Sequence, residues 1–110
     1  MIDLSYLKTT TGNDEAIIKE LVDLFVFQLP DLKKEILDSF EAKNWHALME
    51  AAHKAKNSFE IMGVKKQAEE LKRIEILAKE NKDHIDLELL IENFVDTCQL
   101  VTDEIKALTV

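Results

Sequence analysis

Hydrophobic side chains recur at three- and four-residue intervals along most of the chain, the spacing of a helix that packs one face against a core. The clearest pattern begins after Asp86 and continues almost to the end of the chain. Its apolar positions are Leu87, Leu90, Phe94, Cys98, Val101, Ile105 and Leu108. This pattern predicts one long amphipathic helix, with Asp86 as its N-cap.

A second long helical pattern runs from Asp14 to about Lys43. Its apolar positions are Ile17, Ile18, Leu21, Leu24, Phe25, Leu32, Ile36 and Phe40. Pro30 lies inside the pattern and has no backbone N–H to donate, so we expect a kink or a short break there. Before this helix, Asp3 is placed to cap a short helix over residues 4–8. A turn over residues 9–12 follows, and Asn13 is the expected cap of the long helix.

Two further helices are expected between these long patterns. Asn44 is the predicted N-cap of a third helix, which Gly63 would end in a left-handed conformation. The apolar positions of this helix are Trp45, Leu48, Met49, Ala52, Ala55, Phe59 and Met62. A fourth helix is expected over residues 64–79, followed by a polar segment over residues 80–84. Its inward positions are Val64, Ala68, Leu71 and Ile74.

The composition favours helices and argues against a sheet, because the chain has only two glycines and one proline for tight turns. Amphipathic helices with short connections pack as antiparallel neighbours. We therefore predict an all-α fold, an antiparallel four-helix bundle with a short N-terminal accessory helix. At 110 residues the chain fits one domain, residues 1–110.

Charge and cysteine content narrow the possible partners and the compartment. A formal net charge of -8 disfavours nucleic acid and anionic membranes as main partners, so a protein partner is expected. The sequence contains no signal-like segment at its start and no apolar run of the ~20 residues that a membrane span needs. Cys98 is the only cysteine, so neither an internal disulfide nor a cysteine metal cluster can form. These features predict a cytoplasmic protein.

Several kinds of active site are excluded because their motifs are missing. Phosphate-binding loops and dinucleotide fingerprints need clustered glycines, and this chain has only Gly12 and Gly63. No serine lies in a G-x-S-x-G elbow. Cys98 falls on the apolar face of the last helix, where an inert buried thiol is expected.

The third helix carries a polar stripe next to its apolar face. At about 100° per residue, this stripe contains His46, Glu50, His53, Asn57 and Glu60. Lys56 follows His53 by one turn, so its ammonium can reach an anion attached to the imidazole. A neutral imidazole is a competent nucleophile near pH 7, and these residues therefore form a candidate phosphate site.

Two other interpretations of the same residues remain open. Surface histidines beside lysines are common and usually idle, and we assign His46 and His84 to solvated or capping roles. Glu50 and His53 also form a Glu-x-x-His pair of the kind found in di-metal bundles. Such centres need two of these pairs facing inward, whereas this single pair faces away from the core. We therefore expect no metal site.

The segment Ala51 to Gly63, AAHKAKNSFEIMG, resembles the signature A-H-x-L-K-G-S-x-x-x-x-G of histidine-containing phosphotransfer domains. The segments IDLSYL, TGNDE and FVFQLP, over residues 2–7, 11–15 and 25–30, are similar to the family's opening segments. The resemblance covers the first three quarters of the chain, and the last helix matches only by pattern. It implies that this is a phosphocarrier with no catalytic machinery of its own beyond a positioned nucleophile.

Residue by residue, the resemblance implies that His53 accepts the phosphoryl group and that Lys56 steadies it. Glu75 stands where the family often has a glutamate or glutamine that orients the imidazole. Two positions depart from the family pattern, since Ala55 replaces a leucine and Asn57 replaces a glycine. In the family that glycine looks like clearance for a receiver domain, so the Asn57 substitution bears on the speed of transfer or the choice of partner.

The resemblance also implies the partners, which are the receiver domain of a response regulator and a hybrid sensor histidine kinase. We expect the chain to act as a monomer and to hold no cofactor, with Mg²⁺ supplied by the receiver. Docking is expected to use exposed positions of the third helix, Lys54, Asn57 and Glu60, and neighbouring elements. Six basic and three acidic residues occur from Lys54 to Arg73. An alternative is a helical adaptor that binds a receiver or kinase through the same surface without being phosphorylated.

Overall fold

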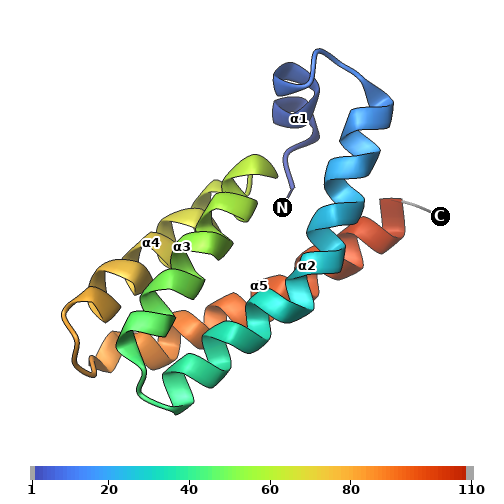
Figure 1. Cartoon of the computed structure of the whole chain (residues 1–110). Helices are drawn as coiled ribbons and strands as arrows, with labels where there is room; N and C mark the ends of the chain where they lie inside the picture. The colour runs from blue at the N-terminus through green and yellow to red at the C-terminus, as the bar shows by residue number, and fades with distance from the viewer. Residues whose placement is uncertain (1, 109–110) are drawn as a thin grey trace.

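A computed structural model describes residues 2–108 of the chain, and within this range all regular secondary structure is helical. Figure 1 shows the arrangement of the helices. Their bounds are α1 Leu4–Thr10, α2 Glu15–Glu41, α3 Trp45–Ile61, α4 Lys65–Lys79 and α5 Ile85–Leu108. The order and number of helices agree with the pattern of apolar positions in the sequence.

Helices α2 to α5 form the predicted four-helix bundle. Helix α3 packs against α2 and α4, and α5 packs against the same two helices. Each helix of the bundle therefore has two neighbours, and the contact between α2 and α5 closes the bundle. The short helix α1 lies at one end of the bundle and contacts α2 (Figure 1). The expected fold, a four-helix bundle with an N-terminal accessory helix, is confirmed.

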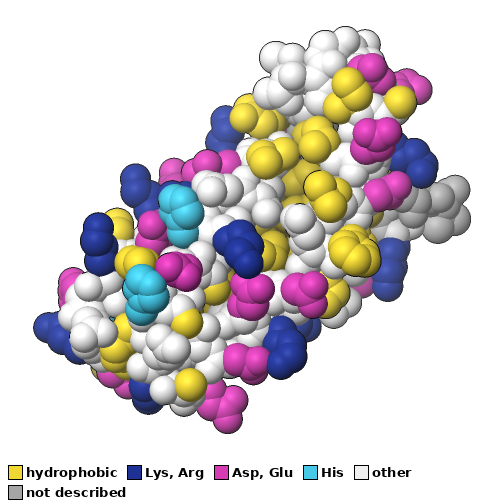
Figure 2. Space-filling model, in the orientation of Figure 1, with side chains coloured by type: hydrophobic (Ala, Val, Ile, Leu, Met, Phe, Trp, Pro, Cys, Tyr) yellow, Lys and Arg dark blue, Asp and Glu magenta, His cyan; other side chains and the backbone are white. Residues whose placement is uncertain are grey.

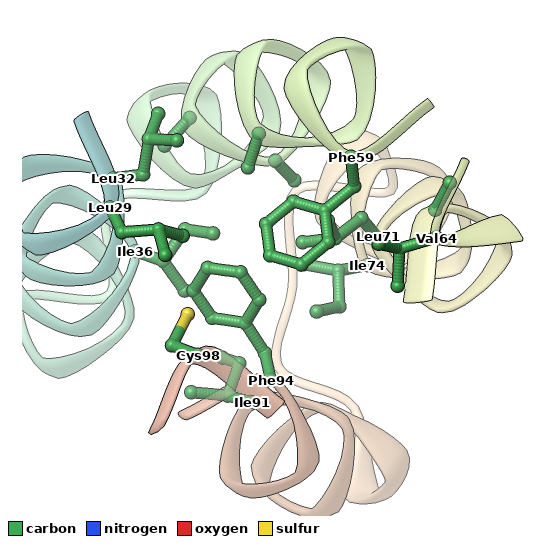
Figure 3. Packing of buried hydrophobic residues seen from close by; sticks show 14 of the residues in the cluster. Leu29, Leu32, Ile36, Phe59, Val64, Leu71, Ile74, Ile91, Phe94 and Cys98 are labelled. Carbon is green, nitrogen blue, oxygen red and sulfur yellow. The ribbon is translucent and has the colours of Figure 1, made fainter. Parts of the chain in front are cut away.

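Aromatic side chains fill the centre of the bundle. The rings of Phe59 on α3 and Phe25 on α2 form a T-shaped pair at a centroid distance of 5.1 Å, and the Phe59 ring lies 5.8 Å from the ring of Phe94 on α5. Figure 3 shows Phe59 and Phe94 between the helices, with aliphatic side chains around them. Such contacts bury large apolar areas and fix the rotation of α3 about its axis. The orientation of α3 determines which of its residues face outward.

Three of the predicted helix ends are confirmed. The side chain of Asp3 accepts a hydrogen bond from Tyr6 N, and that of Asn44 accepts one from Ala47 N. Gly63 has a φ of +74°, the left-handed conformation expected after α3. A Cβ atom at this position would lie only 2.7 Å from Asp3 Cβ, so the closely packed N-terminal segment leaves no room for a side chain.

Two predicted caps are wrong by one or two residues. Asn13 adopts a left-handed φ of 66° in the turn, and Asp14 caps α2 by accepting hydrogen bonds from Ala16 N and Ile17 N. At the last helix, α5 already begins at Ile85, and the ring Nδ1 atom of His84 accepts a hydrogen bond from Asp86 N. The Asp86 carboxylate instead pairs with Arg73 of α4 at 2.7 Å. This contact joins two helices, and local sequence cannot reveal it.

Pro30 does not interrupt α2, which is one continuous helix. Figure 1 shows that the two halves of α2 run in different directions, so the helix bends without breaking. Not every apolar position of the sequence pattern is buried, because Ile17, Leu24 and Leu108 are exposed. No helix in the described part of the chain is long and apolar enough to cross a membrane.

Candidate functional site

His53 lies in the middle of α3 and faces away from the core. The apolar face of the helix, which includes Leu48, Ala52, Ala55 and Phe59, is fully buried. Because this face is held inside the bundle, the neighbouring face turns towards solvent, and 54% of the His53 side chain is exposed. The imidazole is therefore accessible from outside while its backbone is fixed by a rigid helix.

Glu75 from α4 contacts the imidazole of His53. Its Oε2 atom lies 3.0 Å from His53 Nδ1, which is a hydrogen-bond distance. A carboxylate accepts hydrogen bonds, so this contact favours the tautomer in which Nδ1 carries the proton and donates it to Glu75. In that tautomer the lone pair of the neutral ring lies on Nε2. The family resemblance implied that Glu75 lies beside His53, and the two side chains do meet.

Lys56 completes the same cluster. Its Nζ atom lies 3.4 Å from Oε1 of Glu75, the oxygen that His53 does not contact. Only 16% of the Lys56 side chain and 23% of the Glu75 side chain are exposed. One half-buried carboxylate therefore bridges an imidazole and an ammonium group, and it holds a positive charge near the ring. The three candidate residues for phosphoryl acceptance come together in this cluster.

The other candidate residues on α3 stand apart from this cluster. Lys54 pairs with Glu35 of α2, and its Nζ lies 3.0 and 3.2 Å from the two carboxylate oxygens. Asn57 and Glu60 are exposed on the surface of α3. They are accessible to a partner protein, as a docking role requires. The pairing of Lys54 with Glu35 was not predicted, because it depends on how α2 and α3 are rotated against each other.

The remaining histidines have separate surroundings. His46 Nε2 lies 2.9 Å from Glu50 Oε1, one turn along the exposed side of α3. Glu50 is thus paired with His46 and does not form the Glu-x-x-His metal pair with His53. Among residues 2–108 no group of three or more potential ligands could hold a metal ion. His84 caps α5, in line with the structural role assigned to it.

Cys98 is buried among the apolar side chains between α2 and α5 (Figure 3). Burial raises the pKa of its thiol to about 12, because the charged thiolate loses its hydration in the core. At neutral pH the group stays protonated and poorly nucleophilic. This agrees with the inert thiol expected from the sequence.

An apolar patch lies on α2 and α3, close to α1. We use the name apolar patch for Leu24 and Ile61, each 51% exposed, together with Leu21, which lines the same shallow hollow. Figure 2 shows the hydrophobic side chains gathered near this end of the face that also carries histidine side chains. The sequence pattern assigned Leu24 and Leu21 to the core. Leu21 is partly buried against the core, whereas Leu24 is exposed, and hydrophobic periodicity alone could not reveal this difference.

A helical bundle with an exposed histidine, backed by a carboxylate and a lysine, is the arrangement typical of helical phosphotransfer modules. Comparison with known families agrees with this class, since the model of the Hpt domain matches residues 20–109. The chain belongs to the Hpt domain family, whose members are phosphocarrier modules of two-component signalling that interact with receiver domains and kinases. No curated protein and no solved structure matches the chain.

Proposed function

We propose that this chain is a phosphorelay intermediate that accepts a phosphoryl group on Nε2 of His53 and exchanges it with an aspartate of a receiver domain. The observation that carries this proposal is the contact of Glu75 with both His53 Nδ1 and Lys56 Nζ. This contact favours the tautomer in which Nδ1 donates a hydrogen bond to Glu75, and in that tautomer Nε2 is available to attack. Membership of the Hpt family supplies the reaction class.

Each side chain of the cluster has a distinct task in the transfer. The lone pair of Nε2 attacks the phosphorus, an N–P bond forms, and the P–O bond to the partner's aspartate breaks to release a carboxylate. The ring, which keeps its Nδ1 proton, then carries a positive charge that the Glu75 carboxylate stabilises. Lys56, which contacts the same carboxylate, would leave Glu75 and form a charge-assisted contact with a phosphoryl oxygen. The reverse sequence passes the phosphoryl group onward.

The partner supplies what this chain lacks. Phosphoryl transfer depends mainly on positioning and on neutralising the charge of the transferring group. We infer that a receiver domain in the cytoplasm contributes the acceptor aspartate and a Mg²⁺ ion. A hybrid sensor kinase is the expected source of phosphate at the start of the relay. The chain itself works as a carrier and holds no cofactor.

The surface around His53 suits a protein partner. The apolar patch lies two turns along α3 from His53, and exposed apolar groups near a reactive side chain favour docking of another protein. Lys54, Asn57 and Glu60 lie on the exposed side of the same helix. A receiver that covers this surface would exclude water from the transferring phosphoryl group while its aspartate faces Nε2.

The test is incubation with a receiver domain that has been phosphorylated in advance. We expect label on this chain that is lost in acid and retained in base, the stability of a phosphohistidine. The His53→Gln variant should take up no label, and its free energy of unfolding should stay within about 0.5 kcal/mol of wild type, because an exposed side chain adds little stability. Uptake of label by His53→Gln would refute the assignment. A receiver that binds wild type without transferring label would support the adaptor alternative.

A further inference from the structure

Two lysines flank His53, and each is held by its own glutamate. Lys56 pairs with Glu75, which also touches the imidazole. Lys54 directly follows His53 in the chain, but it pairs with Glu35 of α2 through both carboxylate oxygens, at 3.0 and 3.2 Å. Since α2 and α4 pack against different sides of α3, the two ammonium groups are drawn to opposite sides of the helix.

The two pairs have different consequences for an anion on His53. Lys56 shares its carboxylate with the imidazole, so its charge stays inside the cluster where a phosphoryl group would sit. Lys54 is about 61% exposed and carries a long flexible side chain that could otherwise turn towards His53. Its contact with Glu35 holds it on α2 and balances its charge locally. The site therefore offers one ammonium group, that of Lys56, to a phosphoryl group, although two lysines lie within three residues of His53.

We propose that Glu35 limits the positive charge at the phosphoryl site by holding Lys54 on α2. This inference rests on the proposed function of His53. A carrier must both accept and release its phosphoryl group, and every added positive charge near the group favours the phosphorylated form. Glu35 is thus a positioning residue that acts through Lys54. It keeps the phosphohistidine from being stabilised so strongly that onward transfer becomes unfavourable.

The test uses phosphoramidate, a small anionic donor that phosphorylates histidine without any receiver. The Nε2 lone pair attacks phosphorus, the N–P bond of the donor breaks and ammonia leaves. The rate of phosphate incorporation at His53 is followed by mass spectrometry of the peptide that contains it. In Glu35→Gln, Lys54 is freed, and we expect incorporation about two- to fivefold faster at low ionic strength, the effect of one exposed charge. High salt should abolish the difference.

Two further variants decide whether the mechanism is correct. The double variant Glu35→Gln/Lys54→Met should return to the wild-type rate, because the charge that Glu35 restrains is gone. Asp38→Asn is the matched control, since it removes another exposed carboxylate of α2 that pairs with a lysine, Lys34, and it should leave the rate unchanged. The proposal is overturned if Glu35→Gln matches wild type, if its acceleration persists in the double variant, or if Asp38→Asn accelerates equally.

A failure of the proposed function can be distinguished from a failure of this inference, because the phosphoramidate assay needs no receiver. If His53 is not the relay site, wild type will take up no label from a phosphorylated receiver. The comparison of variants with phosphoramidate can still be made in that case. If only the role of Glu35 is wrong, transfer from a receiver will proceed and the phosphoramidate rates will not differ.

Discussion

Oε2 of Glu75 on α4 lies 3.0 Å from Nδ1 of His53 on α3, so the ring is oriented by a residue 22 positions later in the chain. The two helices form the most extensive contact in the bundle, and buried side chains fix how they face each other. The geometry of the candidate site is thus a direct product of core packing. A surface histidine without such a contact would have no partner to favour one tautomer over the other.

The contact predicts that Glu75→Ala slows phosphorylation of His53 by about tenfold or more. A hydrogen bond to a charged group contributes about 1.5 to 3 kcal/mol, and here it would stabilise the charged phosphorylated ring. Glu75→Gln retains a hydrogen-bond acceptor but no charge, so an intermediate rate is expected. Rates with phosphoramidate or a phosphorylated receiver measure both variants.

Nitrogen NMR of the imidazole supplies the control for this prediction. In wild type the neutral ring should carry its proton mainly on Nδ1, and this preference should weaken in Glu75→Ala. An unchanged tautomer ratio together with an unchanged rate would show that the Glu75 contact has no orienting role. A loss of folding, detected by circular dichroism, would instead point to a structural one.

Lys56→Ala should slow transfer without abolishing it. The variant keeps the nucleophile and its orienting glutamate but loses one charge-assisted contact to the phosphoryl group, worth about 1.5 to 3 kcal/mol at most. Lys66→Ala is a suitable control, because Lys66 lies exposed at the start of α4. Transfer rates to one receiver compare the two variants. Equal rates for wild type and Lys56→Ala would make Lys56 an ordinary half-buried lysine.

Replacing Gln67 on α4 with leucine is expected to stabilise the protein. Its side chain is only 3% exposed, and Nε2 has no hydrogen-bond partner among the described residues. A buried polar group without a partner costs about 1 to 3 kcal/mol, so Gln67→Leu should raise the free energy of unfolding by about 1 kcal/mol. Urea titration measures the change. Gln99→Leu, at an exposed position of α5, should give no such gain, and a destabilised Gln67→Leu would contradict the prediction.

The order of the helices could be predicted because each contains its own apolar periodicity and most ends have local signals. Asp3, Asn44 and Gly63 act within a few residues of their positions, and all three were identified correctly. Asp86 was not, because its carboxylate pairs with Arg73 on a different helix. The burial of Gln67 was also missed, because a polar residue outside the apolar pattern is expected to be exposed.

In the candidate site, too, features of a single helix could be predicted, whereas contacts between helices could not be predicted from local sequence. The outward position of His53 and the proximity of Lys56 follow from spacing on one helix. The position of Glu75 was implied by family resemblance, since the contact between α3 and α4 is tertiary. Glu35 had no signal in the sequence, because its pairing with Lys54 depends on the relative rotation of α2 and α3. The exposure of Leu24 likewise depends on tertiary packing, because no neighbouring helix covers its side chain fully.

Asn57 lies one turn beyond His53 on the exposed side of α3, in place of the glycine usual in the family signature. A side chain at this position projects beside the proposed phosphoacceptor, where an approaching receiver would meet it. We predict that Asn57→Gly makes transfer faster with receivers in general, because it opens clearance. The same change should lower the free energy of unfolding by a few tenths of a kcal/mol, since glycine is less favourable than asparagine inside a helix.

Transfer rates to a panel of receivers, with melting temperatures measured alongside, distinguish clearance from recognition. If Asn57 instead forms a hydrogen bond with one cognate receiver, Asn57→Gly would lose speed with that receiver alone. Asn57→Ala separates the two effects, because it removes the amide but keeps a Cβ atom. Clearance predicts that glycine exceeds alanine with every receiver, whereas recognition predicts that both variants fail equally with the cognate one. Wild-type rates for both variants with all receivers would leave Asn57 without a role in docking.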